Sequence, residues 1–424
     1  MFRICNYNRI DKYIWNLGVV VQQGIVESRK NFKRNRIISA VRYHENISRH
    51  DVKKMTGYSM TTVLNIINDL VEQHWLVEED CINVRAGRRP TWLHINPDGF
   101  YTIGVEFNAD RMISVVTDFS FAVIYTAEQA VSLNDTAEQL VEKIKSAIHD
   151  AMEFMGSRKN KVIGIGLGLP GSLDRAKGVG LEYAHLNSWK NVPIRNLIEK
   201  EFGCRVLIEN NINTMALAYR WEKYKEYADD FVLISLRYGI RMGMVINNKL
   251  FVGAGNAGEI GHIKLPNGTR FCSCGKIGCL DTEASFKAIR NKILERMESG
   301  RFSDIKREID GDPNKITMGM FVDSVQRGNK DAQELLAETA ACLGQSLAMV
   351  LGTINPRRII IASKSGMGGK AFSEVLYATL RENAPSSLLE NCHVDCIKVS
   401  DNMGAVGAAM LVMEDELQVV DENV

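Results

Sequence analysis

The chain has 424 residues, 45% of them hydrophobic and 24% charged, which allows a small domain beside a two-lobed larger one and excludes a disordered protein. A formal net charge of +1 excludes a uniformly basic surface, so any nucleic-acid contact must be local. No apolar stretch approaches the roughly 18 residues of a membrane helix, and no cleavage site follows the interrupted apolar patch near the N-terminus. We therefore expect a cytoplasmic protein without membrane contact.

Positive charge is concentrated near the N-terminus. Residues 29–90 contain twelve Lys/Arg and seven Asp/Glu, a net +5, which leaves about −4 for the remainder of the chain. This asymmetry predicts a nucleic-acid-binding domain over residues 29–98 and an acidic body over residues 99–424. Residues 1–28 form an extension to which the sequence assigns no role.

The basic domain begins with two short amphipathic helices. The first begins near residue 31, and its apolar face consists of three residues, Ile37, Ile38 and Val41. Ser48 followed by Asp51 is a capping box that predicts the start of a second helix. We expect Val52 and Met55 to face inward and Gly57 to end this helix.

A third helix follows a short turn and has the composition of a DNA-recognition helix. Ser59 is placed to cap it, and its predicted core face follows i, i+3, i+4 and i+7 spacing with Val63, Ile66, Ile67 and Leu70. The other face carries hydroxyl and amide side chains, which reach phosphates and base edges when a helix lies in the major groove. We predict that the DNA contacts of these helices are made by Arg49, Ser59, Thr61, Thr62, Asn65 and Asn68.

The pattern after this helix predicts a wing. Strands are expected over residues 75–77, 82–84 and 92–95, with Gly87-Arg88-Arg89-Pro90 between the last two. Arg88 and Arg89 suit contact with phosphates or with a narrow minor groove. The alternative, a protein-docking module with solvated charges, agrees less well with the helix spacing and the basic composition.

The remainder of the chain alternates strands with helices. Strands are predicted over residues 101–106, 112–117, 122–126, 162–169, 206–209 and 231–236, and a helix over residues 136–155. This order is typical of an α/β fold. We place a break between two lobes near residue 230.

One histidine and three of the nine cysteines lie close together in the sequence. Gly258-Glu259-Ile260-Gly261-His262 is followed by Cys272-x-Cys274-Gly275 and by Gly278-Cys279. One imidazole and three thiolates form a tetrahedral zinc set with no open position, so the metal would be structural. We predict that Zn²⁺ is held by His262, Cys272, Cys274 and Cys279, and that the other cysteines are packing residues.

Together these features resemble the ROK family, which unites bacterial sugar kinases with sugar-responsive repressors, especially the xylose and N-acetylglucosamine repressor type. The resemblance covers nearly all of residues 30–412. Besides the wing and the zinc motif it rests on Gly164-x-Gly166-x-Gly168-x-Pro170-Gly171, Trp189-x-Asn191-Val192-Pro193, the Glu-Asn-Asn-Ile-Asn run at 209–213, Leu343-Gly344, Ile354-Asn355-Pro356 and Gly404-Ala405-Val406-Gly407-Ala408-Ala409. It implies a two-lobed ribonuclease-H-like fold of the actin/hexokinase type, with a sugar held between the lobes.

The resemblance also implies a sugar-binding set: Asn210, Asn211, Glu259, His262 and Asp281. Amides and carboxylates orient and satisfy a ligand rich in hydroxyl groups. Two positions depart from the family pattern. Asn211 stands where the kinases carry an aspartate base, which bears on catalysis, and Asp281 stands where glutamate is usual, which bears on the sugar that fits.

Three loops that hold nucleotide phosphates in the kinases have lost glycines. Residues 106–110 read Glu-Phe-Asn-Ala-Asp in place of Asp-x-Gly-Gly-Thr, residues 237–243 include Arg237 and Arg241, and residues 362–364 read Ala-Ser-Lys. We interpret the two arginines as filling the vacated space, with phosphate binding by their charge as the alternative. An amide at Asn211 cannot accept the proton of a sugar hydroxyl as a carboxylate does. These losses predict a chain that does not phosphorylate sugar.

The sequence therefore predicts a homodimeric, or tetrameric, repressor of a sugar-utilisation operon that binds double-stranded operator DNA and senses a sugar or sugar derivative. The leading alternative is an ATP-dependent sugar kinase that also binds DNA. A third possibility is a regulator that ignores sugars and binds a protein partner. The identity of the sugar and the operator sequence do not follow from these patterns.

Overall fold

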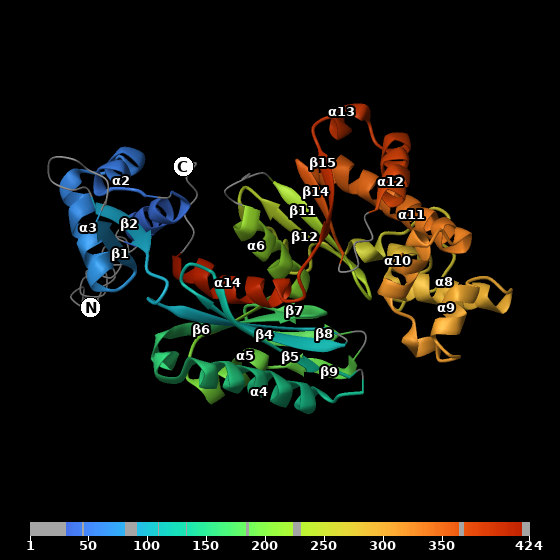
Figure 1. Cartoon of the computed structure of the whole chain (residues 1–424), viewed down its shortest axis with the longest axis horizontal. Helices are drawn as coiled ribbons and strands as arrows, with labels where there is room; N and C mark the ends of the chain where they lie inside the picture. Colours follow the sequence, from blue (N-terminus) through green and yellow to red (C-terminus); the bar gives the residue numbers. More distant parts are fainter. Residues whose placement is uncertain are drawn as a thin grey trace, which may run out of the picture. The chain divides into compact units, whose positions relative to one another are not determined.

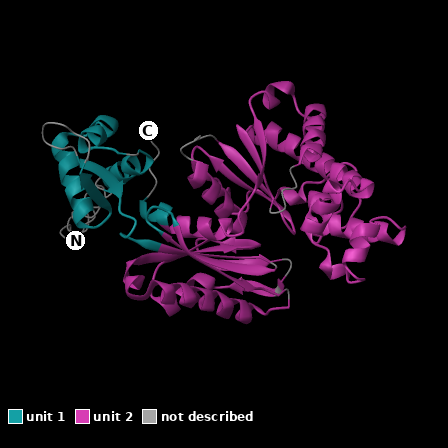
Figure 2. Ribbon diagram, in the orientation of Figure 1, with its two compact units in different colours: residues 1–101, 118–122, 413–424 teal, residues 102–117, 123–412 magenta. Residues whose placement is uncertain are grey.

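The computed structural model describes residues 31–44, 46–80, 91–108, 110–132, 134–183, 186–223, 230–363 and 369–417. Four predicted features lie outside these residues: the extension at 1–28, the strand at 82–84, the wing arginines Arg88 and Arg89, and Lys364 of the third loop. The described chain divides into two compact units (Figure 2). Unit 1 comprises residues 31–101, 118–122 and 413–417, and unit 2 comprises the rest.

Unit 1 has the element order of a winged helix-turn-helix (Figure 1). A helix over residues 31–43 is followed by α2 (Arg49–Thr56), α3 (Met60–Glu72), β1 (Leu76–Asp80) and β2 (Thr91–Ile95). The two strands are antiparallel, with Leu76 opposite Ile95 and Asp80 opposite Thr91, and Leu93 of β2 also forms a bridge with Ile47 before α2. The first strand therefore begins one residue later than predicted and runs on to Asp80.

The start of α2 is the predicted capping box. Ser48 Oγ accepts the Asp51 N–H at 3.2 Å, Asp51 Oδ2 accepts the Ser48 N–H at 3.1 Å, and Gly57 ends the helix with a φ of 70°. The prediction of an inward Met55 is wrong, because this side chain is 39% exposed. Thr56 is buried in its place, since positions four apart share the core face and its hydroxyl bonds to the Val52 carbonyl oxygen at 2.7 Å.

The first lobe of unit 2, up to residue 223, contains a five-stranded sheet covered by helices. Its strands in spatial order are β10 (Val206–Asn210), β6 (Val162–Leu169), β3 (Tyr101–Phe107), β4 (Arg111–Asp118) and β5 (Val123–Ala130). Strands β10 and β6 are parallel, β4 and β5 are antiparallel, and a bulge interrupts the latter pair at Val116/Thr117. Figure 1 shows α4 (Ala137–Met155) and α5 (Ile194–Phe202) on one face of this sheet and α14 (Met403–Leu417) on the other.

The same lobe contains a smaller antiparallel sheet and a helix that reaches the second lobe. The small sheet consists of β7 (Ser172–Asp174), β8 (Val179–Tyr183) and β9 (Leu186–Val192). A short 3₁₀ helix, η2 (Gly156–Lys161), precedes β6. Helix α6 (Asn211–Lys223) follows β10 directly and contacts strands of both five-stranded sheets, namely β6, β10, β11 and β12. The start of α6 is therefore placed where both lobes can contribute side chains.

The second lobe begins at residue 230 and has a five-stranded sheet of its own. The strand order is β13 (Lys249–Leu250), β12 (Ile240–Ile246), β11 (Phe231–Leu236), β14 (Arg358–Ser363) and β15 (His393–Lys398). Strand β11 is antiparallel to β12 and parallel to β14, and β14 is parallel to β15. The other elements are η3 (Ile260–His262), α7 (Leu280–Ala284), α8 (Phe286–Glu298), α9 (Ser303–Glu308), η4 (Pro313–Lys315), α10 (Met318–Gln326), α11 (Lys330–Ile354), α12 (Lys370–Asn383) and α13 (Ser386–Leu389).

Helix α11 departs from the expectation that no segment is apolar and long enough to cross a membrane. By length and composition alone its 25 residues satisfy that test. However, 61% of its most apolar window is buried, and the helix packs against α7, α10 and α12. Burial in the second lobe accounts for its composition, as in the core helix of a soluble protein.

Helix α14 lies very close to the first sheet because glycines of the sheet face small residues of the helix. A β-carbon at Gly104 would lie 1.9 Å from the Ala405 carbonyl oxygen, and one at Gly166 would lie 1.7 Å from that of Ala408. Any side chain at either glycine would force the helix away from the sheet. The glycine-rich motif of β6 therefore packs directly against the glycine- and alanine-rich motif of α14.

Candidate DNA-binding and effector sites

The solvent face of α3 carries three of the predicted DNA-contacting residues. Thr61, Asn65 and Asn68 are exposed, and their spacing of four and three residues places them on one side of the helix. The opposite side fixes α3 in unit 1, with three residues at most 1% exposed, Val63, Ile67 and Leu70. Ile66, predicted as a core residue, is only half-buried. These three side chains are uncharged and able both to donate and to accept hydrogen bonds, while the exposed Asp69 and Glu72 follow on the same side toward the end of the helix.

Two other predicted contacts belong to the helix cap. Ser59 Oγ accepts the Thr62 N–H at 3.2 Å and lies 2.8 Å from Thr62 Oγ1. Such a cap satisfies a helix N–H that would otherwise lack a partner. Ser59 remains exposed and Thr62 is half-buried. The first role of this pair is therefore to start α3, and a DNA contact would be an additional one.

Three cations of unit 1 lie on α2, the helix that precedes α3. Arg49 donates from Nε to Glu78 on β1 at 2.7 Å, so it ties α2 to the sheet. Lys53 and Lys54, in the last turn of α2, are exposed and were not among the predicted DNA contacts. They could have been found from the sequence, because two adjacent lysines just before the turn between α2 and α3 are well placed for phosphate contacts.

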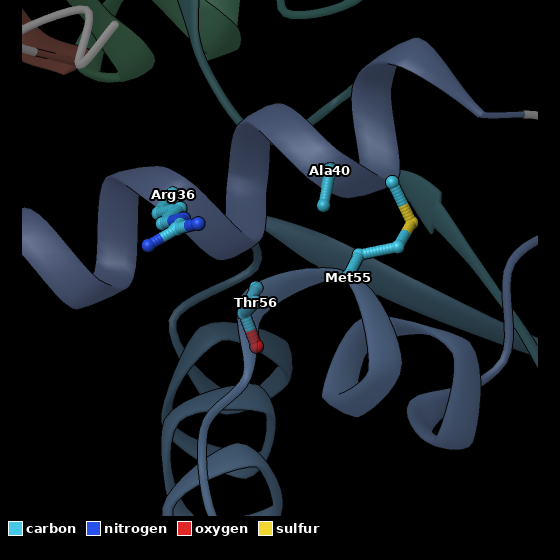
Figure 3. A pocket seen from close by; sticks show the side chains of 4 residues that line it. All are labelled: Arg36, Ala40, Met55 and Thr56. Atoms are coloured by element: carbon cyan, nitrogen blue, oxygen red, sulfur yellow. The ribbon is translucent and has the colours of Figure 1, made fainter. Parts of the chain in front are cut away.

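Unit 1 also has a pocket of about 220 Å³ that the sequence did not predict. It is lined from two helices, by Arg36 and Ala40 on one side and by Met55 and Thr56 of α2 on the other (Figure 3). The guanidinium of Arg36 lies 5.7 Å from the ring of Tyr58. The half-exposed Met55 that contradicts the predicted core face is thus one wall of this pocket.

The predicted metal ligands come together in unit 2. The ligand atoms of His262, Cys272, Cys274 and Cys279 all lie within 4.8 Å of one another. Cys272 Sγ is 3.6 Å from His262 Nδ1, and Cys274 Sγ is 3.6 Å from Cys279 Sγ. Zinc bonds of about 2.0–2.3 Å in a tetrahedron place ligand atoms about 3.3–3.8 Å apart, so the four residues fit this ion.

The thiols of this cluster differ in acidity. Burial and the neighbouring thiols of Cys274 and Cys272 raise the pKa of Cys279 to about 12. The pKa of Cys274 is lowered, because the Lys276 N–H and thiol hydrogen bonds outweigh the opposing effect of burial. A cation with strong affinity for thiolates would remove the protons from both side chains. The chemistry of the donor set thus suits a metal such as zinc.

His262 joins the cysteine cluster to a second group of polar side chains. Its Nδ1 faces Cys272, whereas its Nε2 lies 3.9 Å from Glu259 Oε2. Glu259 in turn accepts a hydrogen bond from Nη1 of Arg241 at the start of β12. Glu259 and Arg241 each remain about one-third exposed, at 31% and 32%. A ligand could therefore reach this pair from solvent.

Asp281 belongs to the same group but is largely committed to the fold. Its Oδ1 accepts the Ile240 N–H at 2.5 Å. A β-carbon at Gly261 would lie 2.8 Å from the same oxygen, and one at Gly239 would lie 3.2 Å from Oδ2. Burial raises the pKa of Asp281, against the effects of the Ile240 hydrogen bond, His262 and Arg241. The carboxylate therefore ties α7 to the turn between β11 and β12, and Gly261 of η3 packs closely against it.

The two predicted asparagines lie at the start of α6 and have different surroundings. Asn210 is 7% exposed, its Nδ2 donates to the Gly171 carbonyl oxygen at 2.7 Å, and its Oδ1 accepts the Ile212 N–H at 3.1 Å. Asn211 is half-buried, and its Nδ2 donates to Asn108 Oδ1 at 2.8 Å. Much of the Asn210 amide is engaged by the backbone, so Asn211 is the more available of the two.

An ion pair that the sequence analysis missed links these asparagines to the Glu259 loop. Arg175, in the turn after β7, donates from Nε to Glu209 Oε2 at 2.5 Å and also from Nη2 to Oε1. Its Nη1 donates to the Gly255 carbonyl oxygen at 2.5 Å, on the loop that leads to Glu259. Glu209 is 4% exposed. No local sequence pattern predicts this pair, because the two residues are 34 positions apart.

Side chains fill the segment that we interpret from its sequence as the first lost phosphate loop. Glu106, at the end of β3, is 1% exposed and accepts from Arg237 Nη1 at 2.7 Å. The same nitrogen lies 3.2 Å from Asn108 Oδ1. A β-carbon at Gly404 would lie 2.3 Å from Glu106 Oε2, so the carboxylate lies against the first turn of α14. Asp110, by contrast, is exposed and pairs with Arg111 at 3.3 Å.

Comparison with known proteins identifies the family. The model of the ROK family matches residues 102–415, well over half of the chain. The chain belongs to the ROK family. The xylose repressor of Caldicellulosiruptor bescii is 27% identical over 392 residues, covering 92% of this chain and 97% of the relative. The transcriptional dual regulator NagC of Escherichia coli is 25% identical over 398 residues, covering 93% and 95%.

Solved structures of ROK proteins share the fold. A ROK family transcriptional regulator, a homologue of the E. coli MLC protein, superposes with a TM-score of 0.79 at 20% identity and covers 93% of this chain and 98% of its own. A ROK family glucokinase from Streptomyces griseus, solved with glucose and AMPPNP, gives a TM-score of 0.62 at 24% identity, covering 74% and 99%. The predicted α/β, two-lobed kinase-like fold is confirmed.

Proposed function

We propose that this ROK protein is a sugar-responsive transcriptional repressor that binds operator DNA through unit 1 and a sugar through unit 2. The observation that carries the proposal is the extent of the similarity. The xylose repressor and the dual regulator NagC match 92% and 93% of the chain, whereas the ROK glucokinase covers 74% of it. The additional part that the repressors share therefore includes unit 1, with its helix-turn-helix.

On the DNA side, α3 would lie in the major groove. Its stripe of Thr61, Asn65 and Asn68 would read base edges, and Lys53 and Lys54 would contact phosphates. The wing arginines Arg88 and Arg89 and the pair Ser59 and Thr62 complete the proposed contact set, whereas Arg49 acts mainly through Glu78. A homodimer, or a tetramer built from dimers, would place two such helices on a pseudo-palindromic operator.

On the effector side, we place a sugar or sugar derivative against Glu259, His262, Asp281 and the asparagines of α6. What supports this site is the availability of Asn211 and the partial exposure of Glu259 beside Arg241. Such groups satisfy both donors and acceptors of a polyol. A protein that binds operator DNA must share a compartment with the chromosome, so we expect it in the cytoplasm.

The metal would be structural. Zn²⁺ bound by His262, Cys272, Cys274 and Cys279 would have no open position for water. The ion would supply cross-linking of residues 262–279, and it would fix the imidazole whose other nitrogen faces Glu259. Its expected contribution is thus to hold one wall of the effector site.

We further propose that the protein is not a kinase. Asn211 carries an amide where a base is needed, and that amide is engaged with Asn108. Arg237 and Glu106 fill the position of the first phosphate loop. This arrangement supports the interpretation that the arginines replaced the loop rather than bind nucleotide.

The proposal is tested by measuring operator affinity with and without sugars. Purified protein is titrated against its upstream intergenic DNA by fluorescence anisotropy, with an aldopentose and aldohexose panel added. We expect one sugar class to change operator affinity by about 5- to 150-fold, a coupling of roughly 1–3 kcal/mol. Asn68→Ala should weaken DNA binding and leave sugar binding intact, whereas Glu259→Gln should do the reverse.

The kinase alternative is tested with the same preparation. Coupled assays of ATP consumption against the sugar panel should show no turnover above background. Sugar-stimulated turnover that Glu259→Gln abolishes would overturn the non-enzymatic assignment. Operator affinity that is identical with every sugar would instead favour a regulator that binds a protein partner.

A further inference from the structure

A continuous chain of polar side chains leads from a buried ion pair to the effector site. It consists of Glu106, Arg237, Asn108 and Asn211. Arg237 Nη1 donates to Glu106 Oε1 at 2.7 Å and to Asn108 Oδ1 at 3.2 Å. Asn108 Nδ2 donates to Glu106 Oε1 at 3.2 Å, and Asn211 Nδ2 donates to Asn108 Oδ1 at 2.8 Å. Every member is thus bonded to the next.

The four residues come from three separate elements. Glu106 and Asn108 lie at the end of β3, Asn211 begins α6, and Arg237 follows β11 in the other five-stranded sheet. The contact between Arg237 and Glu106 joins residues 131 positions apart. The chain of bonds therefore exists only in the folded molecule and ties both lobes to the proposed effector site.

The ion pair fixes the direction of each hydrogen bond. An ionised carboxylate only accepts, and a guanidinium only donates, whereas an asparagine amide presents either its oxygen or its nitrogen according to its neighbours. Glu106 attracts the Nδ2 of Asn108, and Arg237 attracts its Oδ1. With Asn108 held in this orientation, its Oδ1 faces Asn211 and can bond only to the Nδ2 of that residue.

This orientation decides what Asn211 offers to a ligand. One N–H of its amide nitrogen is bound to Asn108, and no donor within the described residues is bonded to its Oδ1. The carbonyl oxygen is left as an acceptor, as one oxygen of an aspartate would be. We infer that Glu106 and Arg237 are positioning residues of the effector site, which act through Asn108 to make Asn211 accept a hydrogen bond from a ligand hydroxyl.

The inference rests on the proposed function and adds a rule of specificity to it. The effector must carry a hydroxyl donor at the position that Asn211 faces. An analogue that lacks this hydroxyl leaves a polar group without a partner and binds more weakly. The ion pair itself need not touch the sugar.

The test uses the full-length protein and isothermal titration calorimetry. The probe is the tightest-binding sugar of an aldopentose and aldohexose panel, together with each of its monodeoxy analogues. For the unchanged chain we expect one deoxy analogue to bind at least about tenfold more weakly than the parent sugar. In Asn108→Leu, which has a similar volume and no acceptor, we expect weaker binding of the parent sugar and loss of this deoxy preference.

A charge-moved variant is the matched control. In Glu106→Gln/Asn108→Asp the negative charge is moved two residues along β3, so residue 108 still accepts from both Arg237 and Asn211. We expect parent-sugar affinity within about threefold of the unchanged chain, and retention of the deoxy preference. If Asn108 had only a structural role, its replacement would not selectively remove the preference for the parent sugar over one deoxy analogue. If Asn108→Leu fails to fold, Asn108→Ala is measured in its place.

The outcomes separate the inference from the proposed function. If no sugar of the panel binds the unchanged protein, both fail. If sugar binds but Asn108→Leu retains its affinity and deoxy preference, the positioning role is overturned and the repressor proposal stands. If the charge-moved variant is folded but loses the deoxy preference, control by hydrogen-bond direction is also overturned.

Discussion

Replacing Arg175 should reveal how strongly the buried ion pair with Glu209 stabilises unit 2. Arg175→Met keeps most of the apolar stem and removes two charge-assisted hydrogen bonds to Glu209, whose side chain is 6% exposed. Removing one partner of a buried pair costs about 3–5 kcal/mol. Glu209 keeps the Asn210 N–H and Asn213 Nδ2 as donors, so we expect the lower value, about 3 kcal/mol.

The matched control lies two residues away. Lys177 pairs with Asp174 at 3.1 Å but is 78% exposed, so Lys177→Met should cost less than about 1 kcal/mol. With an m-value of about 3 kcal/mol/M, urea unfolding should show a midpoint lower by about 1 M for Arg175→Met and nearly unchanged for Lys177→Met. Adding Glu209→Gln to Arg175→Met should recover part of the loss. Equal midpoint shifts for the two single variants would refute this reasoning.

Four further predictions concern the cap, the metal and the DNA face. Ser48→Ala should lower the free energy of unfolding by about 1 kcal/mol in chemical denaturation, and an unchanged value would contradict the capping role. The unchanged chain should contain about one zinc ion by mass spectrometry, and Cys279→Ser should contain less. An unchanged zinc content would show that this thiol is not a ligand. Asn68→Ala should cost about 1–3 kcal/mol of operator affinity and relax sequence preference in a binding selection. Lys53→Ala should instead weaken binding to all DNA sequences alike and reduce the slope of log affinity against log salt concentration by about one. A changed sequence preference in this variant would show that Lys53 contacts a base.

Element predictions succeeded where local chemistry decides the structure. The strand at 162–169 and the strand at 231–236 were predicted to the residue, because each is an apolar run with charged or turn-forming neighbours. The face of α2 was partly wrong. A threonine that bonds its own helix backbone satisfies its hydroxyl and can be buried, so Thr56 replaced the more hydrophobic Met55.

The candidate site was predictable only in part for the same reason. The cysteine spacing predicted the metal cluster, because its four ligands lie within one short segment of the chain. The partners of Arg175 and Arg237 lie 34 and 131 residues away, where no periodicity connects them. The sequence supported the interpretation of Arg237 as filling vacated space, but it did not indicate that Asn108 would receive both this arginine and Asn211.

The close contact of α14 with the first sheet bears on how ROK sequences are classified. Gly104 and Gly166 leave no room for a β-carbon beneath the helix, so selection for packing alone is enough to retain them. In this chain these glycines therefore carry no information about catalysis. A classifier that sorts unstudied members into kinases and repressors should ignore such buried positions and weigh the side chains at 106, 108, 211 and 237.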